Sequence, residues 1–189
     1  MAYDPLANLA PDLVERARRV RMVCLDVDGT LTDGRLFFDS FGRELKAFSV
    51  LDGQGMVLLR RFGFHVVLIT GRPSLVAQNR GQDLGLETHI GVKDKLELLH
   101  RLLEREGLGL EQLCFAGDDL PDLDCLRVAG LAVAPANAHP WIAESVHWTL
   151  PARGGEGAVR QLCDVLLAAH GHLPELLGGA GGSRDGRRA

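Results

Sequence analysis

Carboxylates follow two short apolar runs of the sequence. The stretch CLDVDGTLTDG, residues 24–34, places Asp26 and Asp28 on either side of one valine. The stretch FAGDDLPD brings three more aspartates, Asp118, Asp119 and Asp122. Carboxylates that lie together away from water are costly to desolvate unless a cation or hydrogen bonds compensate them. A hard divalent cation with oxygen ligands removes this cost, and Mg²⁺ is the expected ion.

The expected ligands of this ion are the side chains of Asp26 and Asp118, with the backbone carbonyl of Asp28 as a third. Asp119 and Asp122 are expected beside this set, where they could tune the ligands or bind the ion indirectly. Mg²⁺ keeps water ligands that a substrate phosphate can displace. The same residues therefore suit phosphoryl transfer, in which the charge on the phosphate oxygens must be neutralised.

Further groups that suit phosphoryl transfer lie along the chain. Thr70 in the stretch ITGR can donate a hydrogen bond to a phosphate, with Gly71 beside it, and Lys95 brings a compact positive charge. A carboxylate can act as a covalent nucleophile, and a second acid then protonates the leaving alkoxide and later activates water. Asp28 suits the second role because positions i and i+2 of an extended chain share a face.

Short apolar runs alternate with amphipathic segments. We expect strands over 20–27, 65–70, 88–92, 113–118, 131–135 and 147–150. We expect a helix within 1–20, helices over 52–63, 74–86, 94–108 and 156–171, and a hairpin over about 34–50. This alternation predicts an α/β fold: a Rossmann-like, doubly wound, mainly parallel sheet with helices on both faces. Ligands of such sheets bind at the carboxyl ends of the strands, which is where Asp26, Thr70 and Asp118 fall.

The stretches DVDGTLTDG, ITGR, KDK and GDDLPD, in this order, resemble the four motifs of the haloacid dehalogenase superfamily. The resemblance implies that Asp26 is the nucleophile and that Asp28 is the general acid and base. It also implies that Thr70 and Lys95 bind phosphate and that Asp118 binds the metal. Only a hairpin and one helix fit between the first two motifs, so we expect no separate cap domain.

With DGQG, VAPANAHP and GGEGAVRQLCD, the chain is similar over residues 21–171 to the family of 3-deoxy-D-manno-octulosonate 8-phosphate phosphatases. That resemblance implies a Mg²⁺-dependent phosphomonoesterase that acts through an aspartyl-phosphate intermediate, in a step of lipopolysaccharide precursor synthesis. It also implies a homotetramer that the hairpin helps to build. Arg72 and Arg80 are candidates for holding the substrate carboxylate, because Arg suits bidentate recognition. Ordinary surface charges are the alternative for both.

Composition narrows the choice of partners. The net charge of -4 and the lack of a basic run with interleaved aromatic residues argue against a nucleic-acid partner. No apolar segment approaches the roughly 20 residues that cross a bilayer, and the first residues lack the apolar region of a signal peptide. Four scattered cysteines fit a reducing compartment. We therefore expect a cytoplasmic enzyme with a small acidic sugar phosphate as its substrate, and disorder in the Gly-rich tail over 172–189.

Two alternatives stay open. A phosphatase of a nonulosonate (sialic-type) 9-phosphate, or a broad sugar phosphatase, would share much of this pattern. A non-catalytic binding subunit belongs to a different class of protein. The presence of Asp26, Asp28, Thr70, Lys95 and Asp118 argues against the binding subunit, because loss of function usually removes such groups first.

Overall fold

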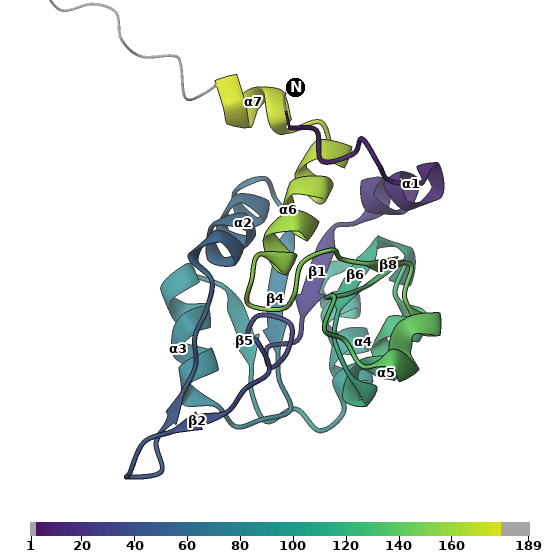
Figure 1. The fold of residues 1–189 in the computed structure, drawn as a ribbon. Helices are drawn as coiled ribbons and strands as arrows, with labels where there is room; N and C mark the ends of the chain where they lie inside the picture. The colour runs from purple at the N-terminus through teal and green to yellow at the C-terminus, as the bar shows by residue number, and fades with distance from the viewer. Residues whose placement is uncertain (1–2, 179–189) are drawn as a thin grey trace, which may run out of the picture.

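The structure is a computed structural model that describes residues 3–178, and its centre is a six-stranded parallel sheet (Figure 1). The strands are β1 (Met22–Leu25), β4 (His65–Ile69), β5 (Glu87–His89), β6 (Leu113–Ala116), β7 (Leu131–Ala134) and β8 (Trp148–Thr149). They lie in the order β5-β4-β1-β6-β7-β8, and each neighbouring pair is parallel. The predicted α/β fold with a parallel sheet is confirmed.

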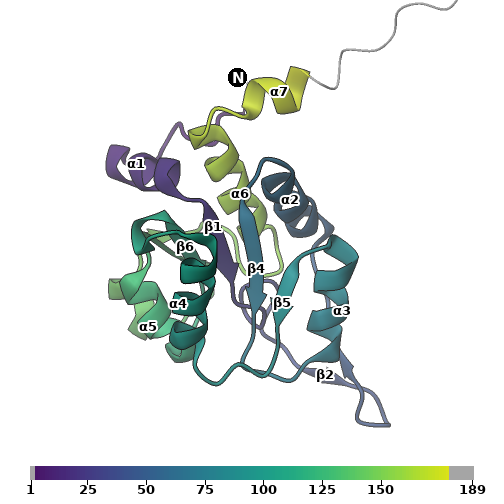
Figure 2. The same ribbon diagram turned by 180° about the vertical axis from the view of Figure 1, so that it is seen from behind.

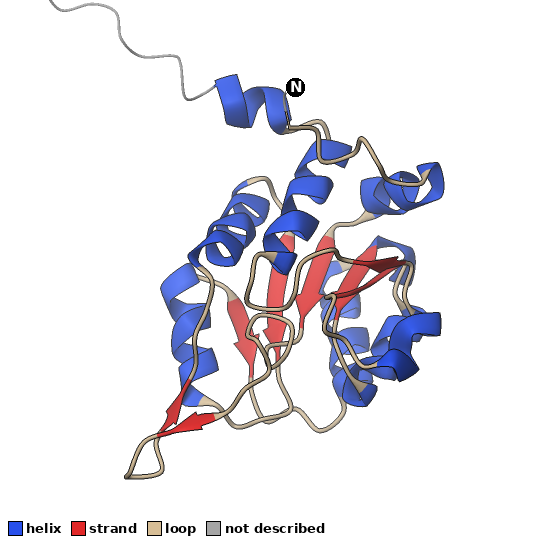
Figure 3. Cartoon of the chain, viewed as in Figure 1, coloured by secondary structure: helices blue, strands red, loops and turns tan. Residues whose placement is uncertain are grey.

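The chain changes direction across the sheet at β1. From β1 it builds β4 and β5 on one side, then crosses to β6 and continues outward to β8. All strands end at the same edge of the sheet, the lower edge in Figure 3. The loops after β1 and β6 therefore diverge at this edge, and such a switch point is where doubly wound sheets bind ligands.

Helices cover both faces of the sheet because the strand side chains alternate between two cores. Val23 and Leu25 of β1 pack into one core and Met22 and Cys24 into the other. The first core is covered by α1 (Pro11–Arg19), α2 (Val50–Arg61), α3 (Leu75–Leu84) and α6 (Ala158–Ala169). The second core is covered by α4 (Lys95–Glu106) and α5 (Leu123–Val128), which Figure 2 shows from behind. All four residues of β1 are buried, which explains their continuous apolar run.

Capping residues fix where α4 begins. The side chain of Asp94 accepts a hydrogen bond from the backbone N–H of Glu97 (2.8 Å), which satisfies one of the free N–H groups of the first turn. The helix ends at Gly107, whose φ of 66° is the left-handed conformation that glycine adopts most readily. This cap places Lys95 at the first helical position, at the edge of the sheet where β1 ends.

The predicted hairpin projects from the carboxyl edge of the sheet. It consists of β2 (Phe37–Phe38) and β3 (Glu44–Leu45), which pair antiparallel (Figure 1). The only elements between β1 and β4 are this hairpin and α2. The described residues therefore contain no separate cap domain over the edge, as predicted.

Several predicted boundaries need correction. The N-terminal helix spans only Pro11–Arg19, where Pro11 occupies the first turn, and β5 spans Glu87–His89 instead of 88–92. The short helix α5 was not predicted, because its six residues are too few to show a clear periodicity. The predicted disorder is wrong for residues 172–178, since Leu173–Gly178 form helix α7. Residues 179–189, for which disorder was also predicted, lie outside the described part. Among residues 3–178, no helix combines the length and the apolar character that crossing a membrane requires.

Candidate active site

A cleft of about 320 Å³ lies at the carboxyl edge of the sheet. Its walls include every residue that the sequence predicted for the site except Arg80: Asp26, Asp28, Thr70, Gly71, Arg72, Lys95, Asp118, Asp119 and Asp122. These residues come from segments up to 96 positions apart, because β1, β4 and β6 are neighbours in the sheet and all end at this edge. The convergence that the sequence predicted is therefore confirmed.

Three carboxylates form a cluster on the sheet side of the cleft. Asp26 follows β1, Asp118 follows β6 after one glycine, and Asp122 ends a 3₁₀ turn at Leu120–Asp122. One oxygen from each side chain lies within 4.8 Å of the others. Asp26 and Asp122 are buried, and Asp118 is half-buried. We expected Asp122 beside the ligand set, but the turn folds it back into the cluster itself, where its Oδ2 accepts a hydrogen bond from the Asp118 backbone N–H (3.1 Å).

Lys95 is the basic group of this cluster. Its Nζ lies 2.5 Å from Asp26 Oδ1 and 2.6 Å from Asp122 Oδ1. Burial lowers the pKa of Lys95, but the attraction of Asp26 and Asp122 is stronger, and the net result is a pKa above the ordinary range. Lys95 is therefore a fixed positive charge in the cleft at any physiological pH.

One lysine does not balance three carboxylates. Burial and then repulsion from Asp122 raise the pKa of Asp26 well above its ordinary value, although Lys95 opposes this rise. Burial, Asp122 and Asp119 raise the pKa of Asp118 to about 6. Burial is the largest cause of both shifts and repulsion among the carboxylates adds to it, so ionising the whole cluster is unfavourable without a further cation. Clustered carboxylate oxygens with uncompensated charge are the donors that Mg²⁺ prefers, so these residues fit the ion.

The loop that carries Asp28 is held by hydrogen bonds and by close packing. The backbone N–H of Leu31 donates to the carbonyl of Val27 (2.9 Å), which turns the chain after the strand. Gly29 has φ of 97°, and a Cβ at this position would meet the carboxylate of Asp118. A glycine is therefore required where the two loops touch.

Asn137 holds the same loop from the outside. Its Nδ2 donates to the carbonyl of Gly29 (2.9 Å), and its Oδ1 accepts from the backbone N–H of Gly154 (2.6 Å). We did not predict a role for Asn137. The only sequence signal was its place in VAPANAHP, three positions after the end of the apolar run that forms β7.

Asp28 faces the hairpin. Its Oδ1 accepts a hydrogen bond from Lys46 Nζ, and its Oδ2 lies 3.4 Å from Thr70 Oγ1 and 4.0 Å from Arg72 Nε. Its carboxylate is not one of the three that form the cluster. We expected only the backbone carbonyl of Asp28 as a ligand, which leaves its side chain available for proton transfer.

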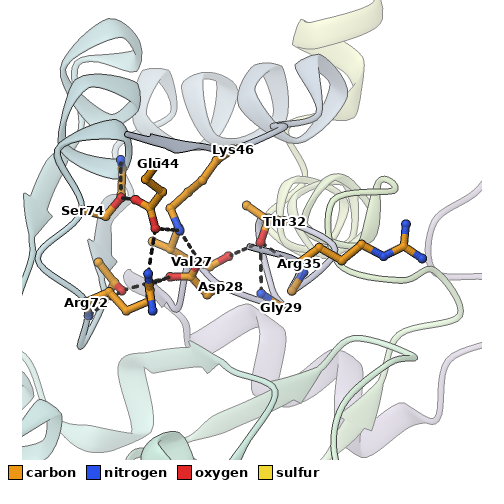
Figure 4. Close-up of polar contacts among 12 residues, drawn as sticks. Val27, Asp28, Gly29, Thr32, Arg35, Glu44, Lys46, Arg72 and Ser74 are labelled. Carbon is orange, nitrogen blue, oxygen red and sulfur yellow. Dashed lines mark hydrogen bonds and ion pairs between the residues drawn. The ribbon is translucent and has the colours of Figure 1, made fainter. Parts of the chain in front are cut away.

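Glu44 is the centre of this second group of charges. It accepts hydrogen bonds from Ser74 Oγ, from Arg72 Nη2 (3.0 Å) and from Lys46 Nζ (3.1 Å) (Figure 4). Burial raises its pKa, but these three hydrogen bonds are stronger together, and the pKa of Glu44 falls below its ordinary value. Glu44 and Lys46 were not predicted. Their spacing of two residues in the stretch GRELKAF, which puts both on one face of an extended chain, is the signal that could have found them.

The two predicted arginines lie in different places. Arg72 lines the cleft, but the structure does not bring Arg80 to it. Arg80 lies on α3, where its Nη1 is 2.8 Å from Asp83 and its guanidinium packs 5.8 Å from the ring centre of Phe48. Arg80 lies six positions after the N-cap Ser74, and its guanidinium lies beside Gly53 of α2, away from the cleft.

The doubly wound sheet, with its acidic cleft at the carboxyl edge, has the fold of the haloacid dehalogenase superfamily. A solved hydrolase of that superfamily from Legionella pneumophila matches this fold with a TM-score of 0.86 at 38% identity, over 89% of this chain and 93% of that chain. No protein-family model matches the chain.

Sequence comparison narrows this class. The 3-deoxy-D-manno-octulosonate 8-phosphate phosphatase of Yersinia pestis is 39% identical over 173 residues, which are 90% of each chain. The chain therefore belongs to this family of phosphomonoesterases. The corresponding phosphatase of Moraxella catarrhalis is 32% identical with a TM-score of 0.88, over 91% of this chain and 99% of that one. Its structure holds a magnesium ion, a phosphate ion and 3-deoxy-D-manno-octulosonate (Kdo).

Proposed function

We propose that this chain is a Mg²⁺-dependent phosphatase that hydrolyses Kdo 8-phosphate to Kdo and phosphate. The observation that carries this proposal is the cluster of Asp26, Asp118 and Asp122 beside Lys95, in a family whose curated members are named for this reaction. The proposed reaction is a step in the synthesis of lipopolysaccharide precursors. A cytoplasmic location is part of the proposal, because all four cysteines are free and buried, which fits a reducing compartment.

Asp26 is the proposed nucleophile. Its carboxylate attacks phosphorus, so an Asp26–phosphorus bond forms while the bond from phosphorus to the sugar oxygen breaks. Lys95 and the Thr70 hydroxyl bind the phosphate oxygens, and the backbone beside Gly71 lets the phosphate approach. Asp26, Asp118 and the carbonyl of Asp28 would hold Mg²⁺, which would supply positive charge beside the phosphate. Asp122 and Asp119 support this ligand set.

Asp28 is the proposed general acid and base. Its carboxyl proton passes to the leaving alkoxide of the sugar, and the resulting carboxylate then takes a proton from the water that hydrolyses the aspartyl-phosphate. Asp28 is suited to both steps because it lines the cleft two residues from the nucleophile, while its carboxylate lies outside the metal cluster.

Arg72 is the proposed ligand of the substrate carboxylate. Its Nε is buried in the wall of the cleft and has no hydrogen-bond partner, although its Nη2 is held by Glu44. The side chain as a whole is 42% exposed in the wall of the cleft, so the guanidinium can donate to the carboxylate of an acidic sugar. A nonulosonate 9-phosphate carries the same group, so it remains the second candidate substrate.

A homotetramer is the proposed assembly. The hairpin carries five large apolar residues that are at least 46% exposed: Leu36, Phe37, Phe38, Phe41 and Leu45. Apolar surface of this kind on a projecting arm is typical of a subunit interface. Sedimentation of the wild type and of Phe41→Ser tests the assembly, because a wild-type monomer with full activity would contradict it.

Phosphate release measures the proposed activity directly. The wild type should release phosphate from Kdo 8-phosphate with Mg²⁺ and lose this activity with a chelator. Its kcat/KM for Kdo 8-phosphate should exceed those for a nonulosonate 9-phosphate and for hexose phosphates. A hexose phosphate preferred by tenfold or more would overturn the acidic-sugar assignment. If the wild type and Asp26→Asn released phosphate at equal, near-zero rates, the proposed enzymatic activity would be wrong.

A further inference from the structure

Lys46 is a buried cation that does not line the cleft. Its side chain is 1% exposed, although it lies on an arm of the chain whose neighbouring apolar residues are exposed. A buried ammonium group is unfavourable unless charged partners hold it. Lys46 has two such partners, Asp28 and Glu44, and these contacts turn it inward from the hairpin (Figure 4).

These contacts hold the two oxygens of Asp28 differently. Oδ1 accepts from Lys46, outside the cleft, whereas Oδ2 faces Thr70 at 3.4 Å, and Thr70 lines the cleft. Only Oδ2 is therefore directed to where a substrate would bind. Without Lys46, the carboxylate would keep only the Thr70 hydroxyl and the guanidinium of Arg72 at 4.0 Å, and both of these lie on the Oδ2 side.

Glu44 fixes Lys46 in turn. It contacts Lys46 on the hairpin, and it also contacts Arg72 and Ser74, which follow β4. These polar contacts connect the hairpin to the sheet. The hairpin therefore has a contact with the reaction site in addition to the apolar surface it exposes.

We propose that Lys46, held by Glu44, is a positioning residue that directs Oδ2 of Asp28 toward the leaving oxygen of the substrate. This inference rests on the proposed function, and it assigns to the hairpin a role in proton transfer. Lys46 does not touch the substrate, because it does not line the cleft. Its loss should therefore lower kcat more than it raises KM.

The leaving group separates this role from a structural one. A sugar alkoxide needs a proton as it leaves, whereas p-nitrophenolate is a stable anion that leaves without one. The ratio kcat/KM reports the steps up to release of this first product and excludes the later attack of water. A positioning residue for proton transfer should therefore affect kcat/KM for Kdo 8-phosphate far more than kcat/KM for p-nitrophenyl phosphate.

The test compares Lys46→Met with the control variant Arg18→Met, which changes an exposed basic residue on α1, away from this network. General acid catalysis contributes roughly 10²- to 10⁴-fold, so we expect Lys46→Met to lower kcat/KM for Kdo 8-phosphate by about 10- to 100-fold. The loss with p-nitrophenyl phosphate should be less than about threefold. Lys46→Arg, which keeps the charge, should recover part of the activity, and Arg18→Met should match the wild type.

A double-mutant cycle shows whether Lys46 acts through Asp28. Asp28→Asn should show the same substrate dependence more strongly, and adding Lys46→Met to it should cause little further loss. Equal losses of Lys46→Met on both substrates, no loss at all, or additive losses in the cycle would overturn the inference. If Asp28→Asn itself lowered kcat/KM equally for both substrates, the proposed role of Asp28 as general acid would be wrong instead.

Discussion

On the sheet side of the cleft three carboxylates share one lysine, whereas on the hairpin side two carboxylates share a lysine and an arginine. The first group consists of Asp26, Asp118 and Asp122 around Lys95. The second consists of Asp28 and Glu44 with Lys46 and Arg72. Fully ionised, the first group has two negative charges in excess and the second has none.

This difference in balance suggests different roles. Burial and then repulsion between carboxylates raise the pKa of Asp26 and of Asp118, so the ionised sheet side favours a divalent cation. The pKa of Glu44 is lowered, so the hairpin side is satisfied by contacts within the chain. A balanced network holds side chains in place, whereas an unbalanced one attracts charged ligands. We therefore expect substitutions on the two sides to have different effects.

The largest contrast should come from two substitutions that each replace a carboxylate with its amide. Asp26→Asn removes the proposed nucleophile and should lower kcat for Kdo 8-phosphate by roughly 10⁴-fold or more. Glu44→Gln removes a charge of the hairpin network and should lower kcat by less than about tenfold, since Gln keeps an oxygen that accepts hydrogen bonds. Phosphate release under saturating substrate measures both. Comparable losses would show that the two sides do not differ in role.

The next effect concerns stability without metal. Because the folded-state pKa of Asp118 is about 6, above the unfolded value near 3.9, the folded protein binds more protons between these values. Stability should therefore fall as the pH rises from about 4 to about 6, by on the order of 1–2 kcal/mol from this group. Urea unfolding of the wild type and of Asp118→Asn in chelator measures it. The two curves should approach each other as the pH is lowered, and parallel curves would contradict the charge imbalance.

The smallest effect should come from an exposed ion pair away from the cleft. Hydrogen bonds from Arg105 lower the pKa of Glu87 to about 2, below the unfolded value near 4.3. Its stabilisation is complete above about pH 4.3 and is lost as the pH falls toward 2. Because solvent screens the pair, Glu87→Gln should cost less than about 1 kcal/mol at pH 7. Urea unfolding at pH 7 and pH 3 measures the change in the free energy of unfolding. A larger change for Glu87→Gln than for Asp118→Asn would contradict the expected order of the two effects.

The sequence predicted every member of the sheet-side group, but only Asp28 and Arg72 of the hairpin-side group and not Glu44 or Lys46. Asp26, Thr70 and Asp118 directly follow apolar strands or lie within two residues of them, so strand pattern and parallel topology are enough to bring them together. The contact between Asp28 and Lys46 depends on how a short hairpin folds back over the edge, and no local pattern encodes that path. Arg80 shows the same limit, because its helix could be predicted but the direction of its side chain could not.

Mg²⁺ binding to the apo protein tests the difference between the two sides most directly. Calorimetric titration measures the Mg²⁺ affinity of the wild type, Asp118→Asn and Glu44→Gln. Each substitution removes one negative charge, the first from the sheet side and the second from the hairpin side. We expect Glu44→Gln to bind Mg²⁺ within about threefold of the wild type and Asp118→Asn to bind at least about tenfold more weakly, because loss of a ligand charge acts directly on the ion. Equal weakening in both variants, or wild-type affinity in Asp118→Asn, would contradict the assignment of the metal to the sheet side.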